Sequence, residues 1–269
     1  MLSFEEHYSQ YLGFDLNDDR QIVVCHSPLR DKIESFRVPM ITAGVNKKQR
    51  VFSVSHDLMQ LMGVVVLKQR RNDLSEVEWC QRIDDLLFGH FYTFHIHRFQ
   101  RMTVKSETLV NPGLDVNIVT KLTEGELKLL QNNKKKAFDT RGEKRREQMA
   151  VRDRKIVSDG RYFAVLLDGS IASRASVDPV ECGGGNIGVV TEPKYRGKGY
   201  GRAVVFQATN WCLENNFIPI YWVDITNTTS VKLAEDLGFE KMSEEIIVKH
   251  WPGDAWEEYQ AKTGKADNC

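Results

Sequence analysis

The chain has 269 residues, and its 37 Lys and Arg balance its 37 Asp and Glu to a formal net charge of zero. This balance excludes a global field that draws nucleic acid or an anionic membrane, and the length fits one large domain or two ordinary ones. Five cysteines form an odd set without a Cys-x-x-Cys pair, which argues against a disulfide framework and a zinc site. No apolar run reaches about 18 residues, and the N-terminus has no signal-like apolar stretch. We therefore expect a cytoplasmic, reduced protein that binds no metal.

Residues 1–110 alternate strand-like and helix-like runs, which predicts a small N-terminal α/β domain. The runs at 21–25 and 50–54 are rich in β-branched residues and predict strands. Farther on, His95 and His97 alternate along another strand-like run, but two histidines supply too few ligands for a tetrahedral zinc site. We assign no chemistry to this domain from its residues.

Two helices are predicted within this first segment. One starts near Asp57 behind a capping serine, Ser53 or Ser55, and ends at Gly63. The other follows Ser75, where Glu78 completes a capping box before an apolar stripe.

Turn residues at 111–113 separate the first segment from the strand-like run 114–119. A helix opening follows at Thr123, and residues 134–155 then carry ten Lys or Arg against four Asp or Glu. Such a stretch is compatible with an anion- or nucleic-acid-binding patch, but Phe138 is its one aromatic residue. A pair of solvated helices is the simpler interpretation.

The clearest hairpin in the sequence joins strand-like residues 162–167 to residues 170–177. Asp168-Gly169 between them supplies the positive φ angles of a type I′ turn. The next stretch, 178–185, contains three consecutive glycines and is expected to form a flexible loop.

A predicted strand at 186–191 runs through a glycine-rich turn into a helix that starts at about Arg202. Exposed amide groups at a helix start form a ready phosphate site, and Gly197, Gly199 and Gly201 allow close approach to the backbone. Three cations lie at the rim of this turn: Arg196, Lys198 and Arg202. The glycine spacing matches neither a Walker loop nor the dinucleotide fingerprint.

Beyond this turn the chain continues with further features at a fixed spacing. They are a strand at 218–226, the pattern Asn227-x-x-Ser230, and a helix end at Leu233 to Phe239. With Arg196-x-x-Gly199-x-Gly201, this order resembles the GNAT superfamily of acyl-CoA-dependent N-acetyltransferases. The run from Ser230 to Phe239 is similar to the zwittermicin-resistance-type branch. The resemblance covers about residues 114–251.

The resemblance implies an α/β (α+β) fold with a GNAT-type mixed, mostly antiparallel sheet flanked by helices. This domain is expected at 111–253, after the smaller N-terminal domain at 1–110 and before a tail at 254–269. The implied reaction moves an acetyl group from acetyl-CoA to a primary amine of a small molecule by direct attack, without an acyl-enzyme. The implied partners are acetyl-CoA and that amine, with no nucleic acid and no membrane. The oligomeric state stays open, with a homodimer as one option.

The resemblance also implies a cofactor site. In this family the backbone of the cofactor strand pairs with the pantetheine arm, and an N–H group of the strand polarises the acetyl carbonyl. The implied cofactor-binding residues are Val189, Val190, Thr191, Arg196, Gly197, Lys198, Gly199, Tyr200, Gly201, Arg202, Asn227 and Ser230.

The catalytic acid and base are less defined. Many members of the family have a tyrosine proton donor seven residues after the asparagine, where this chain has Ala234. The candidates that remain are Asp224 as base and Tyr221 or Ser230 as proton donor. A buried, hydrogen-bonded role for Asp224 and a helix-capping role for Ser230 are equally compatible with the pattern.

Two alternatives belong to other functional classes. A protein that lacks the usual tyrosine is compatible with an acyl-CoA-binding regulatory role without catalysis. A nucleic-acid-associated role would rest on residues 134–155 and is opposed by the neutral net charge. Cys212 lies on the buried face of its helix and Cys182 has no neighbouring base, so neither is expected to act as a nucleophile.

Overall fold

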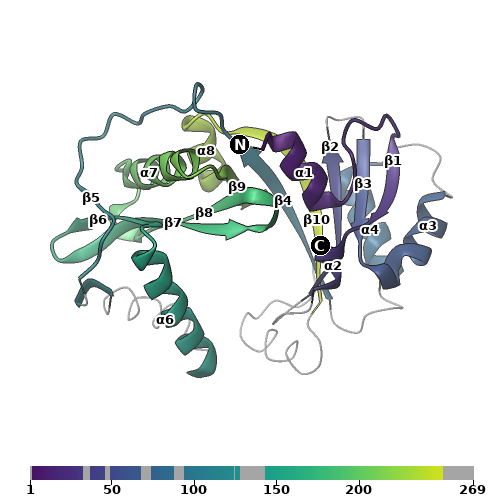
Figure 1. Ribbon diagram of the computed structural model, residues 1–269, viewed down its shortest axis with the longest axis horizontal. Coiled ribbons are helices and arrows are strands. Elements are labelled where there is room, and N and C mark those ends of the chain that lie inside the picture. Colours follow the sequence, from purple (N-terminus) through teal and green to yellow (C-terminus); the bar gives the residue numbers. More distant parts are fainter. Residues whose placement is uncertain are drawn as a thin grey trace. The chain divides into compact units, whose positions relative to one another are not determined.

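The computed structural model describes residues 2–32, 37–45, 49–67, 74–87, 94–123, 125–127 and 143–250. The chain divides into two compact units, and each is discontinuous in sequence (Figure 1). The N-terminal unit comprises Leu2–Arg101, Val223–Asn227 and Lys241–Cys269; the central unit comprises Met102–Trp222 and Thr228–Glu240. These limits differ from the predicted domains 1–110 and 111–253, which stay predictions, and the predicted tail at 254–269 lies outside the described residues.

The N-terminal unit is built on a mixed sheet with the strand order β1-β3-β2-β10-β4. Its strands are β1 (Ile22–His26), β2 (Arg37–Val45), β3 (Gln49–Val54), β4 (Phe94–Thr103) and β10 (Glu240–His250). Its helices are α1 (Phe4–Leu12), α2 (Pro28–Asp31), the 3-10 turn η1 (His56–Leu58), α3 (Met59–Leu67) and α4 (Glu76–Leu87). β1 and β3 are parallel, whereas β2 is antiparallel to both β3 and β10. The buried side chains of α3 and α4, including Met62, Trp79 and Ile83, pack with Phe52 in one core cluster.

Local patterns in this unit were predicted with mixed success. The strands at 21–25 and 50–54 are confirmed as β1 and β3. The capping box is confirmed as well, because the Ser75 amide donates to Glu78 Oε2 at 2.7 Å and the Glu78 amide donates to Ser75 Oγ at 3.3 Å. The predicted helix end at Gly63 is wrong, because Gly63 lies inside α3. A glycine weakens a helix but does not end it when packing supplies the stability.

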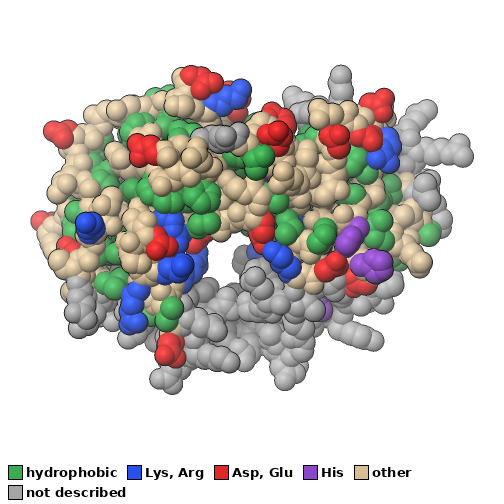
Figure 2. All heavy atoms as spheres, viewed as in Figure 1, with side chains coloured by type: hydrophobic (Ala, Val, Ile, Leu, Met, Phe, Trp, Pro, Cys, Tyr) green, Lys and Arg blue, Asp and Glu red, His purple; other side chains and the backbone are tan. Residues whose placement is uncertain are grey.

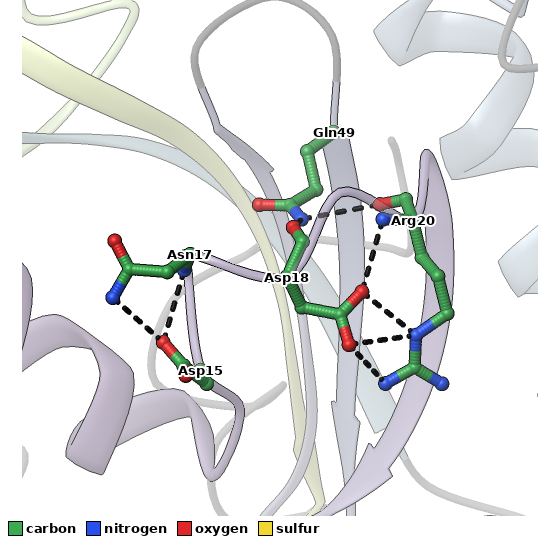
Figure 3. A network of polar contacts seen from close by, with 5 residues as sticks. All are labelled: Asp15, Asn17, Asp18, Arg20 and Gln49. Carbon is green, nitrogen blue, oxygen red and sulfur yellow. Dashed lines mark hydrogen bonds and ion pairs between the residues drawn. The ribbon is translucent and has the colours of Figure 1, made fainter.

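A short polar network shapes the turn between α1 and β1 (Figure 3). Arg20 Nε donates to Asp18 Oδ1 at 2.9 Å, and the Asn17 amide donates to Asp15 Oδ1 at 3.0 Å. Gln49 Nε2 donates to the backbone oxygens of Asp18 and Arg20 at 2.7 and 3.1 Å. The amide of one β3 residue thereby ties the turn to the sheet.

The central unit contains the strand order β9-β8-β7-β6-β5. Its strands are β5 (Ile118–Val119), β6 (Tyr162–Leu167), β7 (Ser170–Val180), β8 (Gly184–Thr191) and β9 (Ile218–Asp224), the last two residues of which belong to the N-terminal unit. Its helices are α6 (Glu143–Ser158), η2 (Glu181–Gly183), η3 (Pro193–Tyr195), α7 (Tyr200–Glu214) and α8 (Thr228–Asp236). Among these strands β8 and β9 pair in parallel, whereas β5 to β8 form antiparallel pairs. The predicted mixed, mostly antiparallel sheet flanked by helices is confirmed.

Two turns predicted from glycine are also confirmed. Asp168 and Gly169 have φ angles of 50° and 67°, as a type I′ hairpin requires. At the end of α8, Gly238 has a φ of 89°, and the Phe239 amide donates to the Ala234 oxygen at 3.0 Å. This is the Schellman arrangement that ends a helix with a left-handed glycine.

The expected flexible loop at 178–185 is wrong. β7 and β8 stay paired out to Val180 and Gly184, and η2 alone joins them. Gly185 is buried, and a Cβ there would lie 2.8 Å from Cys212 Sγ of α7. Gly185 therefore allows close packing of strand and helix.

The segment before the hairpin is only partly described. Of the strand expected at 114–119, Ile118 and Val119 pair with β6. The Thr123 amide donates to Glu126 Oε2 at 2.7 Å, as the helix opening predicts. Of the basic stretch 134–155, residues 134–142 lie outside the described residues, and residues 143–155 belong to α6.

Candidate functional site

β8 and β9 separate partway along their length. They pair at Gly184–Ile218, Gly185–Pro219 and Asn186–Ile220, and each strand then continues without the other. On its other side β8 remains paired with β7 as far as Thr191. From Ile187 to Thr191, the edge of β8 that faces β9 therefore makes no backbone pairing with β9. Such an edge can accept an extended ligand as an added strand.

The two faces of β8 are defined by its contacts. A Cβ at Gly185 would touch Cys212 of α7, and a Cβ at Gly201 of α7 would lie 3.1 Å from Thr191 Oγ1. Residues 185 and 191 therefore face α7, and by strand alternation residues 186, 188 and 190 face away from it. Val190 is 48 % exposed, so the outer face of β8 is open at this point.

The free edge of β8 leads into the glycine-rich turn. Gly197 and Gly199 have φ angles of 75° and 84°, and Gly199 is the N-cap of α7, which starts at Tyr200 rather than at Arg202. No side chain caps the helix, so its first amide groups are left for another acceptor. The positive end of α7 and these amide groups favour an anion at this point. The predicted stretch from Val189 to Arg202 is therefore one continuous strand edge and turn.

The cations of this turn are held in place by neighbours. Arg196 Nε donates to the Thr191 oxygen at 3.3 Å, and Arg202 pairs with Asp236 of α8 at 3.5 Å. Lys198 Nζ lies 5.6 Å from the centre of the Tyr195 ring. The turn thus has a positive rim, with Arg202 partly neutralised.

Tyr221 and Ser230 form a hydrogen bond next to the separation of β8 and β9. Tyr221 follows Ile220, the last residue of β9 that pairs with β8, and its hydroxyl lies 2.7 Å from Ser230 Oγ. Ile220 pairs with Asn186 and faces away from α7, so Tyr221 faces the side on which α7 and α8 lie. Burial raises the pKa of Tyr221, and the hydrogen bond with Ser230 offsets part of that rise. The phenol therefore keeps its proton at neutral pH.

Asp224 and Asn227 lie in the short segment assigned to the N-terminal unit. The carboxylate oxygen Oδ1 of Asp224 accepts from the Thr226 amide at 2.9 Å and from Thr226 Oγ1 at 2.6 Å. The Asn227 amide donates to the Asp224 oxygen at 2.9 Å. These bonds form the turn between β9 and α8. The catalytic role of Asp224 and the cofactor contact of Asn227 stay predictions.

Other chemistry receives no support from the described part of the chain. Cys212 is fully buried, and burial raises the pKa of its thiol to about 12, so it is not ionised at neutral pH. No group of three or more His, Cys, Asp or Glu in these residues is arranged to hold a metal ion. None of the helices described is long and apolar enough to cross a membrane.

Sequence reasoning missed part of the free edge. Ile187 and Gly188 precede the predicted residues, and Gly188 is exposed. A Cβ at Gly188 would have Ser176 Oγ as its nearest neighbour, at 4.0 Å, so the space above this residue is open. A glycine inside a strand is a signal for close approach of another backbone, and it was available in the sequence.

Solved structures and a curated relative resemble this chain. A GNAT-family acetyltransferase from Colwellia psychrerythraea is 12 % identical with a TM-score of 0.49, over 75 % of each chain. A GCN5-related N-acetyltransferase from Sphaerobacter thermophilus is 13 % identical with a TM-score of 0.49, over 79 % of this chain and 78 % of that one. "Uncharacterized N-acetyltransferase YdfB" of Bacillus subtilis (strain 168) is 31 % identical over 90 residues, about a third (34 %) of each protein. A family model described as GNAT acetyltransferase matches residues 78–246, more than half of the chain. The chain therefore belongs to the GNAT acetyltransferase family.

Proposed function

We propose that this protein transfers an acetyl group from acetyl-CoA to a primary amine of a small molecule. The observation that carries the proposal is the free edge of β8, which leads directly into an uncapped helix start. One continuous segment thereby offers hydrogen-bonding groups to an extended arm and then amide groups to a diphosphate. The zwittermicin-resistance-type branch, the cytoplasmic location and a homodimer stay predictions.

The proposed contacts follow from this order. The backbone groups of Val189, Val190 and Thr191 would pair with the pantetheine arm. The amide groups from Gly197 to Gly201 would hold the diphosphate, with Arg196 and Lys198 at the rim. Gly201 also lets α7 and α8 approach, because a Cβ there would lie 3.0 Å from Leu233 Cδ1.

Direct attack by the amine needs proton transfers at two points. An alkyl ammonium group with a pKa near 10.4 must lose its proton before it attacks, and the thiolate that leaves gains from a proton donor. We assign the donor role to the Tyr221 hydroxyl together with Ser230. Asp224 stays the predicted base. The buried, un-ionised thiol of Cys212 supports a route without an acyl-enzyme.

The first test is acetyl-CoA binding by calorimetry on the parent and on Gly199→Asp. This change places an anionic side chain in the phosphate turn at a φ of 84°, so we expect binding to be lost. Gly169→Asp is the matched control, because Gly169 also has a positive φ, with no atom within 4 Å of a Cβ, and lies in the hairpin. We expect this control to bind acetyl-CoA like the parent.

A thiol-release screen over amines in the same samples tests the transfer step. Release with an amine supports the enzyme, whereas binding without release from any amine would support the acyl-CoA-binding regulatory alternative, which family membership does not favour. Absence of acetyl-CoA binding by the parent would refute both.

A further inference from the structure

Arg174 is a half-buried cation on the outer face of the central sheet. Its guanidinium group makes no hydrogen bond or ion pair with any described residue. Three other arginines of this unit form ion pairs: Arg152 with Asp178, Arg161 with Asp159 at 2.8 Å and Arg202 with Asp236 at 3.5 Å. A partly buried charge without a partner raises the free energy of the folded protein. Arg174 is therefore a candidate to bind an anion from outside the chain.

The register places Arg174 beside the proposed reaction centre. Arg174 pairs across the strands with Val190 of β8 on one side and with Ala164 of β6 on the other. Cross-strand partners share a face, so Arg174 and Val190 both lie on the face away from α7, with Cβ atoms about 5 Å apart. The backbone of Val190 belongs to the free edge that would hold the acyl-CoA. An amine that attacks from the outer face therefore comes within reach of the guanidinium group.

A second polar group on this face lacks a hydrogen-bond partner among the described residues. Tyr162 is 3 % exposed, and its hydroxyl makes no hydrogen bond there. It pairs with Ser176, which in turn pairs with Gly188, so all three share the face of Arg174. Burial raises the pKa of Tyr162, the nearby Arg174 lowers it, and Asp153 of α6 raises it. The hydroxyl thus stays protonated as a donor, with one cation and one carboxylate near it.

The outer face of the sheet is covered at β6 and exposed at β8. Ile156 of α6 packs on Tyr162 and Ala164, so α6 covers β6, whereas Gly188 and Val190 of β8 are exposed. Lys and Arg side chains gather together with acidic ones near α6 (Figure 2). Asn186 Oδ1, which faces the same side, is also buried and has no hydrogen-bond partner in the described part of the chain. This face of the sheet therefore has exposed residues on β8 next to buried polar atoms that lack hydrogen-bond partners among the described residues.

We infer that the acetyl acceptor is an amine that carries a carboxylate, and that Arg174 and the Tyr162 hydroxyl bind this carboxylate. The inference rests on the proposed function and names its substrate class, that of amino acids and related small molecules. A guanidinium group matches the planar carboxylate in shape and charge. Asp153, the nearby anion, disfavours acceptors with a second acidic group.

The test compares acceptors that differ only in the carboxylate. Alanine and alaninamide are offered with acetyl-CoA, and kcat/KM is measured by thiol release; phosphoethanolamine and spermidine extend the panel. We expect alanine to be preferred by about tenfold or more, as a charge-assisted hydrogen bond would give. The amide has the more acidic ammonium group and hence more free amine, so this difference works against the expected result.

Variants assign the preference to its residue. Arg174→Met should abolish the preference for alanine without changing the acetyl-CoA affinity, and Arg174→Lys should keep part of it. Arg152→Met, which removes a paired arginine near the same face, is the control and should keep the preference. Thermal unfolding of each variant checks that it is folded.

The outcomes separate the inference from the proposed function. The inference is supported if the preference for alanine is lost in Arg174→Met and kept in Arg152→Met. Two results with a parent that binds acetyl-CoA would overturn the inference and leave the cofactor site intact. One is a preference for alaninamide, phosphoethanolamine or spermidine over alanine. The other is the absence of acetylation of any amine that carries a carboxylate. A preference that persists in Arg174→Met also overturns it. Failure of the parent to bind acetyl-CoA in the calorimeter overturns the proposed function itself.

Discussion

The proposed role of Tyr221 rests on its hydrogen bond with Ser230 and on its position in β9. Its ring is 2 % exposed, and its hydroxyl is bonded to Ser230 at the point where β9 leaves β8. If the pair protonates the leaving thiolate, Tyr221→Phe should lower kcat for amine acetylation about a hundredfold, the lower range for a general acid. The affinity for acetyl-CoA should be unchanged. Stopped-flow thiol release and calorimetry on the same variant measure the two quantities.

The same burial determines the pH dependence expected for this variant. Burial raises the pKa of Tyr221 above its ordinary value of 10.0, so the phenol stays protonated as pH rises to about 10. Tyr221→Phe should therefore lower the rate by the same factor from pH 6 to about 10. Ser230→Ala in the same background should add little, because groups that act as a unit are not additive. An unchanged kcat in Tyr221→Phe would contradict the assignment.

Single residues show where sequence reasoning succeeds. Gly199 and Gly238 were predicted from local patterns, and both have left-handed backbones that favour glycine. Gly63 and Gly185 were misinterpreted, because the same residue type also occurs within a helix and at a close strand–helix contact. The difference depends on packing partners distant in sequence. Arg174 was not singled out for the same reason: its isolation is a property of the folded sheet.

At the scale of elements, a buried polar cluster joins α1, β4 and β10. Arg101 Nε donates to Glu245 Oε1 at 2.7 Å, and Tyr8 donates to the same oxygen at 2.7 Å. Glu245 is fully buried and Arg101 is 3 % exposed. Burial and the charge of Glu245 raise the pKa of Tyr8, so it donates at neutral pH. The cluster thus connects three elements far apart in sequence.

Loss of one charge in this cluster should be costly. Glu245→Gln leaves the Arg101 cation buried without its anion, and we expect about 3–5 kcal/mol of destabilisation, measured by urea unfolding. Glu244→Gln is the matched control, because its pair with Arg98 is partly exposed and should contribute about 1 kcal/mol or less. Equal effects of the two changes would refute the special role of the buried pair.

Most elements could be predicted from sequence, but not which strands are neighbours. The hairpin of β6 and β7 has its turn signal within the chain, whereas the pairing of β10 with β2 joins segments about 200 residues apart. No local pattern specifies such a pairing, and the separation of β8 from β9 is equally non-local. The glycine turn of the candidate site was therefore predicted from its own residues, whereas the free strand edge was expected only from the family resemblance.

At the scale of the whole molecule, β10 determines which part of the chain can be deleted without exposing buried apolar residues. Ile246, Ile247 and Val248 are fully buried and pair with Thr42, Ile41 and Met40 of β2. Burying each of the three is worth about 1.5–3 kcal/mol, so together they approach the net stability of a typical domain, about 5–15 kcal/mol. A fragment of residues 111–253, the domain expected from sequence, keeps this strand and loses its partner.

We therefore expect residues 111–253 alone to aggregate or to lack cooperative unfolding. A fragment of residues 102–240 retains the central unit and omits β10 beyond its first residue, so it should be more soluble and should bind acetyl-CoA. Circular dichroism during urea unfolding, dye binding to exposed apolar surface and calorimetry compare the two fragments. Cooperative unfolding of 111–253 with little dye binding would show that β10 does not need β2, and the domain boundaries expected from sequence would then be the better description.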